Sequence, residues 1–116
     1  MKNIVLIALV TFLGFSAQAQ TQTKKNKNLK YTTEVNGNCE QCKKRIEKAA
    51  FGVPGVKSAS WDISSHELTV ILNEEKSSTA DLNKAIAKVG HDTKDVKATE
   101  SDYANLHSCC KYVREE

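Results

Sequence analysis

The order of the hydrophobic patterns along the chain limits its fold more than any other feature. Alternation of apolar and polar residues predicts four strands, over residues 29–35, 56–63, 66–73 and 93–98. The third of these carries Leu68, Val70 and Leu72 on one side, so one face of that strand is expected to be buried. Segments whose apolar residues recur at helical spacing follow the first and the third of these strands.

The first helical segment covers residues 40–51. Its apolar residues Cys42, Ile46 and Ala49 recur at the spacing of one helix face. Gly52 follows the segment directly and is a typical helix stop. We therefore predict a helix that packs on the sheet through this face.

The second helical segment begins at residues 78–81, which resemble a capping box with Asp81 in place of the usual Glu. Gly90 is predicted to end this helix. The resulting order is β-α-β-β-α-β. It predicts an α+β, ferredoxin-like fold, in which two helices cover one face of a four-stranded antiparallel sheet.

Residues 1–19 have the pattern of a secretory signal peptide. Lys2 gives a positive start, residues 4–15 form an apolar run, and residues 17–19 read Ala-Gln-Ala, a signal-peptidase site. The run is shorter than the roughly 20 residues that a membrane-spanning helix needs. We expect cleavage before Gln20 and export to the periplasm, with an uncleaved N-terminal anchor as the alternative.

The rest of the chain is predicted to form one small domain with two flanking segments. Residues 20–28 are polar and lysine-rich and are expected to be a flexible leader. Residues 29–98 form the predicted domain, and residues 99–116 form a tail that contains Cys and His. The formal net charge of +3 is too small to indicate nucleic-acid binding. We expect a monomer that is not embedded in a membrane.

Two thiols stand close together at the start of the first predicted helix. Cys39 and Cys42 follow Gly37-Asn38, and basic residues come directly after them, at positions 43, 44, 45 and 48. A helix N-terminus and nearby cations both favour the thiolate. Two thiolates can bind one soft metal ion, with Cu(I) first and Hg(II) or Zn(II) as alternatives. A disulfide between the two cysteines is the other interpretation.

Residues 31–98 resemble a heavy-metal-associated domain. The resemblance rests on Val-Asn-Gly at 35–37, Ile-Glu-Lys-Ala at 46–49 and Val-Pro-Gly-Val at 53–56, with matching runs at 68–70 and 82–90. One position departs from the family, which has Gly-Met-x-Cys-x-x-Cys. Here Asn38 runs directly into Cys39, and the Met that packs beneath the loop in the family is missing.

The resemblance implies a metal-binding protein that is not an enzyme. The family includes copper chaperones, N-terminal domains of metal pumps and a periplasmic mercury-binding protein. For this chain it implies that Cys39 and Cys42 hold the metal, and that a metal-transporting membrane protein or an efflux component is a partner. His91 stands where the family has a residue near the metal loop, so it is either a further ligand, a modulator of the thiol pKa, or a surface residue.

The tail carries a second set of metal-binding residue types. His107, Cys109 and Cys110 offer one imidazole and two thiols, and Leu106 and Tyr112 on either side are apolar anchors for packing. One interpretation is that the three polar residues fold back as additional ligands or form a second site. The alternatives are a disulfide between the tail and the first cysteine pair, and a disordered tail.

A periplasmic thiol-disulfide oxidoreductase is the second functional interpretation of the same cysteine pair. Its support is weaker, because Glu-Gln separates the cysteines and no Trp precedes them. The one proline of the chain, Pro54, directly follows the first predicted helix instead of lying opposite the motif. We therefore predict capture or relay of a soft metal without catalysis.

Overall fold

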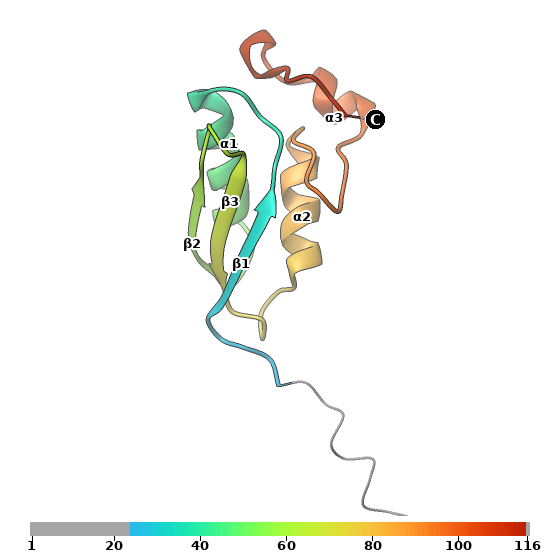
Figure 1. Cartoon of the computed structure of the whole chain (residues 1–116). Helices are drawn as coiled ribbons and strands as arrows, with labels where there is room; N and C mark the ends of the chain where they lie inside the picture. Colours follow the sequence, from blue (N-terminus) through green and yellow to red (C-terminus); the bar gives the residue numbers. More distant parts are fainter. Residues whose placement is uncertain (1–23, 116) are drawn as a thin grey trace, which may run out of the picture.

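The computed structural model describes residues 24–115 and shows an α+β fold (Figure 1). The predicted signal peptide, residues 20–23 of the predicted leader and residue 116 lie outside the described residues. The elements are, in chain order, β1 (Leu29–Glu34), α1 (Glu40–Phe51), β2 (Val56–Trp61), β3 (Glu67–Leu72), α2 (Thr79–Lys88), α3 (Glu100–Ala104) and the 3₁₀ turn η1 (Ser108–Cys110).

The sheet has the strand order β1-β3-β2, and the central strand β3 is antiparallel to both neighbours. Within β3, Leu68 has Thr33 of β1 and Trp61 of β2 as its partners in register. Leu68, Val70 and Leu72 are fully buried, and the residues between them are less buried. The alternation predicted for this strand is therefore confirmed.

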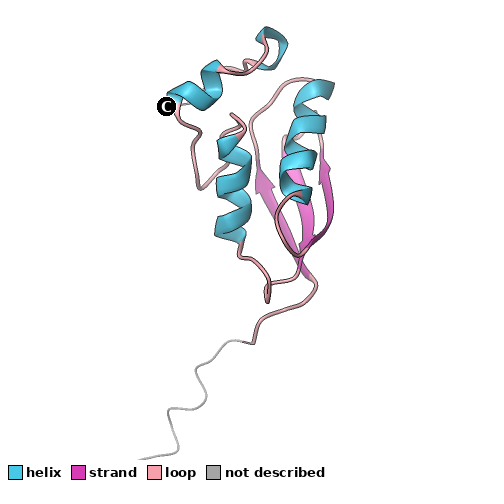
Figure 2. Cartoon of the chain, turned by 180° about the vertical axis from the view of Figure 1, so that it is seen from behind, coloured by secondary structure: helices cyan, strands magenta, loops and turns pink. Residues whose placement is uncertain are grey.

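Two helices cover one face of the sheet, as predicted (Figure 2). α1 buries Cys42, Ile46 and Ala50 against the sheet. α2 packs beside it and buries Leu82 and Ile86. Both helices therefore place their apolar faces in one core between helices and sheet.

The capping box predicted at the start of α2 is present. Asp81 N–H donates to Ser78 Oγ at 3.1 Å, and Ser78 N–H donates to Asp81 Oδ2 at 2.9 Å. These two bonds satisfy N–H groups that have no partner inside the helix. The turn before α2 thereby fixes where the helix begins.

The fourth strand predicted over residues 93–98 is wrong, because this segment bonds to itself. Thr93 N–H donates to the Val96 carbonyl at 2.8 Å, and Val96 N–H donates to Thr93 Oγ1 at 2.9 Å. A single bridge, between Val35 and Thr93, joins the segment to the chain beyond β1. Within residues 24–115 the sheet therefore has three strands.

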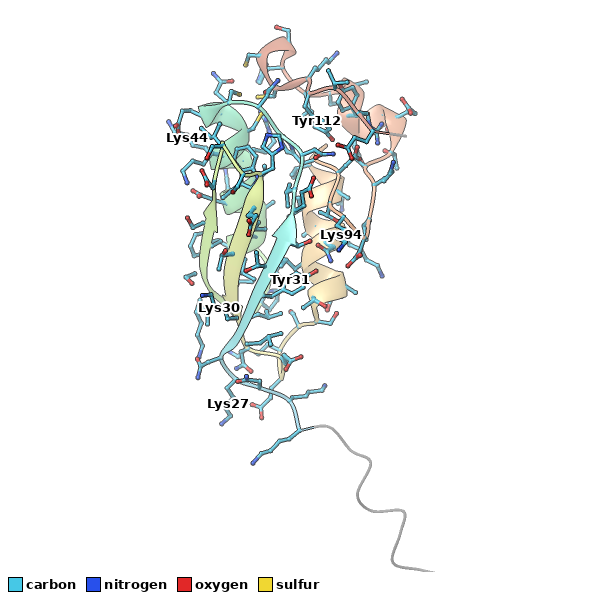
Figure 3. The ribbon with its side chains drawn as sticks, in the orientation of Figure 1. Lys27, Lys30, Tyr31, Lys44, Lys94 and Tyr112 are labelled. Carbon is cyan, nitrogen blue, oxygen red and sulfur yellow. The ribbon has the colours of Figure 1, made fainter. Side chains whose placement is uncertain are left out.

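The tail docks on the loop that follows α2 (Figure 3). The Tyr112 hydroxyl donates to the Gly90 carbonyl and accepts from Asp92 N–H, both at 2.8 Å. Gly90 has φ +104°, and a Cβ there would lie 2.8 Å from the Asp102 carbonyl oxygen and 2.9 Å from Leu106. The close approach of the tail therefore depends on glycine at this position.

An ion pair holds the end of the tail. Arg114 donates through Nε and Nη2 to the two carboxylate oxygens of Asp92, at 3.0 and 2.8 Å. Burial by itself raises the pKa of Asp92, but the hydrogen bonds from Arg114 and from Ala98 N–H outweigh it and lower the pKa. This two-point pairing is among the stronger ionic contacts that proteins make.

The opposite end of the domain joins the leader to the β3–α2 connection. Asn26 N–H donates to Glu74 Oε1, and Glu74 N–H donates to the Asn26 carbonyl, both at 2.9 Å.

No helix within residues 24–115 combines the length and the apolar character needed to cross a membrane.

Tyr112→Phe is expected to destabilise the folded protein. Loss of the hydroxyl leaves the buried Gly90 carbonyl and Asp92 N–H without their partner, which costs about 1–3 kcal/mol in the free energy of unfolding. Urea unfolding measures this difference. Val113→Ala is the matched control, since Val113 is 92 % exposed and the change should cost less than about 0.5 kcal/mol. Equal stability of Tyr112→Phe and the wild type would contradict this account of tail docking.

Candidate metal centre

The loop before α1 rests on a tryptophan. A Cβ at Gly37 would lie 3.1 Å from Trp61 Cη2 and 3.1 Å from Cys42 Cβ, so only a hydrogen fits there without displacement. Trp61 Nε1–H donates to the Val35 carbonyl at 3.0 Å, just before the loop. The indole therefore supports the loop that carries the cysteines.

A lysine and a glutamate of α1 fix the helix against the end of β2. Glu47 Oε2 accepts from Lys43 Nζ at 2.6 Å and from Trp61 N–H at 2.9 Å. Lys43 Nζ also donates to the Trp61 carbonyl at 2.9 Å. The first turn of α1, which carries the cysteines, is thereby held in place relative to the sheet.

Cys39 and Cys42 lie together at the start of α1. Cys39 is the N-cap residue with extended backbone, φ −152° and ψ 173°, and Cys42 is fully buried in the first turn. Their sulfur atoms are 3.2 Å apart. The Cys42 thiol also donates to Asn38 Oδ1 at 3.3 Å. The two thiols therefore converge on one point at the helix N-terminus.

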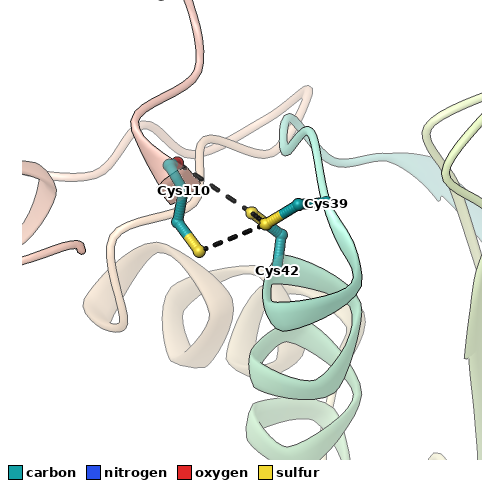
Figure 4. Close-up of side chains that lie close together, drawn as sticks. All are labelled: Cys39, Cys42 and Cys110. Carbon is teal, nitrogen blue, oxygen red and sulfur yellow. Dashed lines mark hydrogen bonds between the residues drawn. The ribbon is translucent and has the colours of Figure 1, made fainter. Parts of the chain in front are cut away.

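The tail brings a third thiol to this point (Figure 4). Cys110 in η1 is fully buried, and its Sγ lies 3.4 Å from Cys39 Sγ. The sulfur atoms of Cys39, Cys42 and Cys110 all lie within 4.8 Å of one another. All four cysteines of the chain are free thiols in this structure, so the disulfides considered from sequence are not formed. We call Cys39, Cys42 and Cys110 the three-thiol cluster.

The cluster contains one acidic and one very weakly acidic thiol. Burial alone raises the pKa of Cys39, but the Cys42 N–H and the thiols of Cys42 and Cys110 favour its thiolate and lower the pKa to about 7. For Cys42, burial and, to a smaller extent, side-chain hydrogen bonds with Cys39 and Cys110 raise the pKa to about 12. Cys39 therefore ionises before Cys42, and a bound cation would supply charge that stabilises the Cys42 thiolate.

The remaining predicted tail residues lie outside the cluster. Cys109 is exposed, with its Sγ 3.8 Å from Cys110 Sγ and 3.1 Å from Gln41 Oε1. His107 is exposed and lines an open hollow beside α1 with Gln41 and Lys44. The structure thus brings one of the three predicted tail groups into the cluster and leaves a second next to it.

His91 is neither in the cluster nor on the surface. It is fully buried, stacks on Tyr112 with ring centroids 5.6 Å apart, and its Nδ1 lies 2.8 Å from the Asn36 carbonyl. Burial lowers its pKa, so the ring is neutral near pH 7 and Nδ1–H is the donor. Nε2 has no partner among the described residues. His91 packs the tail against the loop.

The basic residues after the cysteine pair have separate surroundings. Lys43 is paired with Glu47. Lys44 and Lys48 are exposed (Lys44 is labelled in Figure 3), and Arg45 is partly buried. Lys44, Arg45 and Lys48 line one open hollow beside α1, whereas Lys43 faces Glu47.

Sequence reasoning missed the two features that shape this centre. Trp61 is buried in the core, but nothing in its alternating strand shows that it lies against the cysteine loop. The Asp92–Arg114 pair joins residues 22 positions apart, and no sequence spacing indicates it. The one sequence signal for this pair is the charged residue Arg114, two positions after the apolar anchor Tyr112.

Alkylation of the reduced, metal-free protein should distinguish the thiols by pH. Because its pKa is about 7, Cys39 should react with iodoacetamide at a rate that rises through pH 7 as the thiolate forms. Cys42, buried and with a pKa of about 12, should stay unmodified below pH 9. Peptide mapping by mass spectrometry measures both sites. A Cys39 rate that rises only near the ordinary thiol value of 9.0 would contradict this arrangement.

Solved structures with the same fold include metal-handling proteins. A CopZ metallochaperone matches with 26 % identity and a TM-score of 0.54, over 56 % of this chain and 98 % of its own. Oxidized MerP from Ralstonia metallidurans CH34 matches with 26 % identity and a TM-score of 0.55, over 58 % and 94 %. The N-terminal domain of a potential copper-translocating P-type ATPase from Bacillus subtilis, in the Cu(I)-loaded state, matches with 31 % identity and a TM-score of 0.55, over 58 % and 85 %.

A search of the curated proteins found no match. The family model of the heavy-metal-associated domain matches residues 33–92, which include the cysteine loop, both large helices and most of the sheet. The match ends before the tail that supplies Cys110. This chain belongs to the heavy-metal-associated domain family.

Proposed function

We propose that the protein captures or relays a soft metal ion, with Cu(I) as the first candidate, through the three-thiol cluster. The observation that carries this proposal is the convergence of Cys39, Cys42 and Cys110 within 4.8 Å at a helix N-terminus. Thiolates are soft ligands and select Cu(I) and similar ions over hard cations. The Cu(I)-loaded state of a similar ATPase domain supports the choice of metal.

The number of ligands favours Cu(I) or Hg(II) over Zn(II). Structural Zn(II) sites use four protein ligands, usually in tetrahedral arrangement. The cluster supplies three, and neither His91 nor His107 joins it among the described residues. Burial of Cys42 and Cys110 also limits water as a fourth ligand. An ion that accepts three soft ligands suits this centre best.

The proposed place of action is the periplasm. The basis is the signal-peptide pattern of residues 1–19, and N-terminal sequencing of the exported protein is expected to begin at Gln20. A soft-metal carrier in this compartment needs a donor or acceptor, and we propose a metal-transporting membrane protein or an efflux component. Recovery of the uncleaved chain in the membrane fraction would contradict this location.

One observation also fits the thiol-disulfide oxidoreductase interpretation. Cys39 has a pKa of about 7 beside a thiol with a pKa of about 12, the pairing expected of an attacking and a resolving cysteine. Metal binding remains the stronger proposal, because Cys110 is a third converging thiol that a two-cysteine exchange reaction does not need.

Metal titration with matched variants tests the proposal. The reduced exported chain, offered Cu(I), Hg(II) and Zn(II) in competition, should retain one Cu(I) or Hg(II) by native mass spectrometry. Cys42→Ser should abolish tight binding, since it removes the buried ligand of the loop. Cys110→Ser should retain one ion with affinity lowered at least about tenfold, which corresponds to about 1.4 kcal/mol.

Ser108→Ala is the control, since it changes the same turn without removing a thiol. Affinity equal to wild type in Cys42→Ser would show that the metal binds elsewhere. Multiple turnovers of a scrambled disulfide substrate with glutathione, lost in Cys39→Ser, would favour the oxidoreductase instead.

A further inference from the structure

The fourth cysteine of the chain stands directly outside the three-thiol cluster. Cys109 is exposed, whereas Cys42 and Cys110 have no exposed surface and Cys39 is partly buried. The Cys109 sulfur is 3.8 Å from the Cys110 sulfur. A metal–thiolate bond is about 2.3 Å long, so one ion can touch both sulfurs at this spacing without backbone movement. Cys109 therefore links the solvent with the buried cluster.

The position of Cys109 is held by a neighbour in the cysteine loop. Its thiol donates to Gln41 Oε1 at 3.1 Å, and Gln41 lies between the two cysteines of α1. The turn that carries it has its own backbone bonds, including Cys110 N–H to the His107 carbonyl at 2.8 Å. The exposed thiol is thus presented in one place beside the cluster.

The tail is fixed on both sides of this turn. Leu106 and Tyr112 are 6 % and 5 % exposed, and both belong to the hydrophobic core. Detaching the tail would therefore expose apolar surface and break the bonds of the Tyr112 hydroxyl. A route for metal that leaves the tail docked avoids this cost.

We propose that Cys109 is the exchange thiol through which soft metal enters and leaves the three-thiol cluster. This inference rests on the proposed function and adds the route by which metal moves. The exchange partner is a thiol carrier of the class of glutathione or a cysteine of another protein. Cys109 is a transient ligand, and Cys39, Cys42 and Cys110 are the resident ones.

The exchange is a sequence of ligand substitutions without electron transfer. The Cys109 sulfur forms a bond to Cu(I) on the carrier, one carrier thiolate leaves, and that thiolate takes up the proton that Cys109 gives up. Cys110 then bonds to the same ion and passes its proton through solvent to Cys109 as the Cys109–metal bond breaks. Finally Cys39 and Cys42 bond to the ion: Cys39 gives its proton to solvent, and the remaining carrier thiolate leaves with the proton of Cys42. The copper remains Cu(I), and release follows the same steps in reverse.

Two measurements on the full exported chain test this route. The first is the equilibrium affinity for Cu(I), by competition with a chromophoric chelator under anaerobic conditions. The second is the rate of loading from Cu(I)–glutathione, followed by stopped flow. Cys109→Ser should leave the affinity unchanged within about twofold and slow loading at least about tenfold, which corresponds to a barrier raised by about 1.4 kcal/mol.

Matched variants separate the outcomes. Ser108→Ala alters the neighbouring exposed residue and should change neither affinity nor rate, while Cys110→Ser should lower the affinity. Wild-type loading rates in Cys109→Ser would overturn the route and point to direct attack at Cys39. A lower affinity in Cys109→Ser would make Cys109 a resident ligand and likewise overturn it. Failure of the wild-type protein to bind either Cu(I) or Hg(II) would instead overturn the proposed function.

Discussion

The side chain of Tyr112 makes the contacts on which the three-thiol cluster depends. The Tyr112 hydroxyl bridges the Gly90 carbonyl and Asp92 N–H. The Tyr112 ring stacks on His91 and packs edge-to-face with Tyr103. These contacts fix the tail two residues after Cys110. The third thiol is therefore positioned by packing at a distance from the cluster, which is how preorganised sites usually hold their ligands.

Docking of the tail changes what the cysteine loop of this fold can do. A loop with two thiols at a helix N-terminus offers two ligands, and here η1 places a third thiol beside them (Figure 4). More soft ligands and less water favour retention of the ion. The docked tail hinders transfer to a partner, and an exposed thiol next to the cluster relieves this conflict without undocking the tail.

Much of the scaffold could be predicted from sequence because its signals are local. The extent of α1, the capping box at Ser78 and the alternation in β3 follow from neighbouring residues. The prediction of a fourth strand failed because Thr93 and Val96 form hydrogen bonds with each other instead of with a neighbouring strand. Alternation of apolar and polar residues does not reveal this competition. The convergence of Cys110 with Cys39 depends on Asp92, Arg114 and Tyr112, whose contacts join residues far apart in the chain, and sequence alone left it as one of several alternatives.

X-ray absorption at the copper edge tests most directly whether the tail supplies a metal ligand. The Cu(I)-loaded wild-type protein should show three sulfur atoms in the first coordination shell, and Cys110→Ser should show two. Cys109→Ser should keep three. Two coordinating sulfur atoms in both the wild-type protein and Cys110→Ser would contradict this assignment. The metal would then be held by Cys39 and Cys42 without the tail.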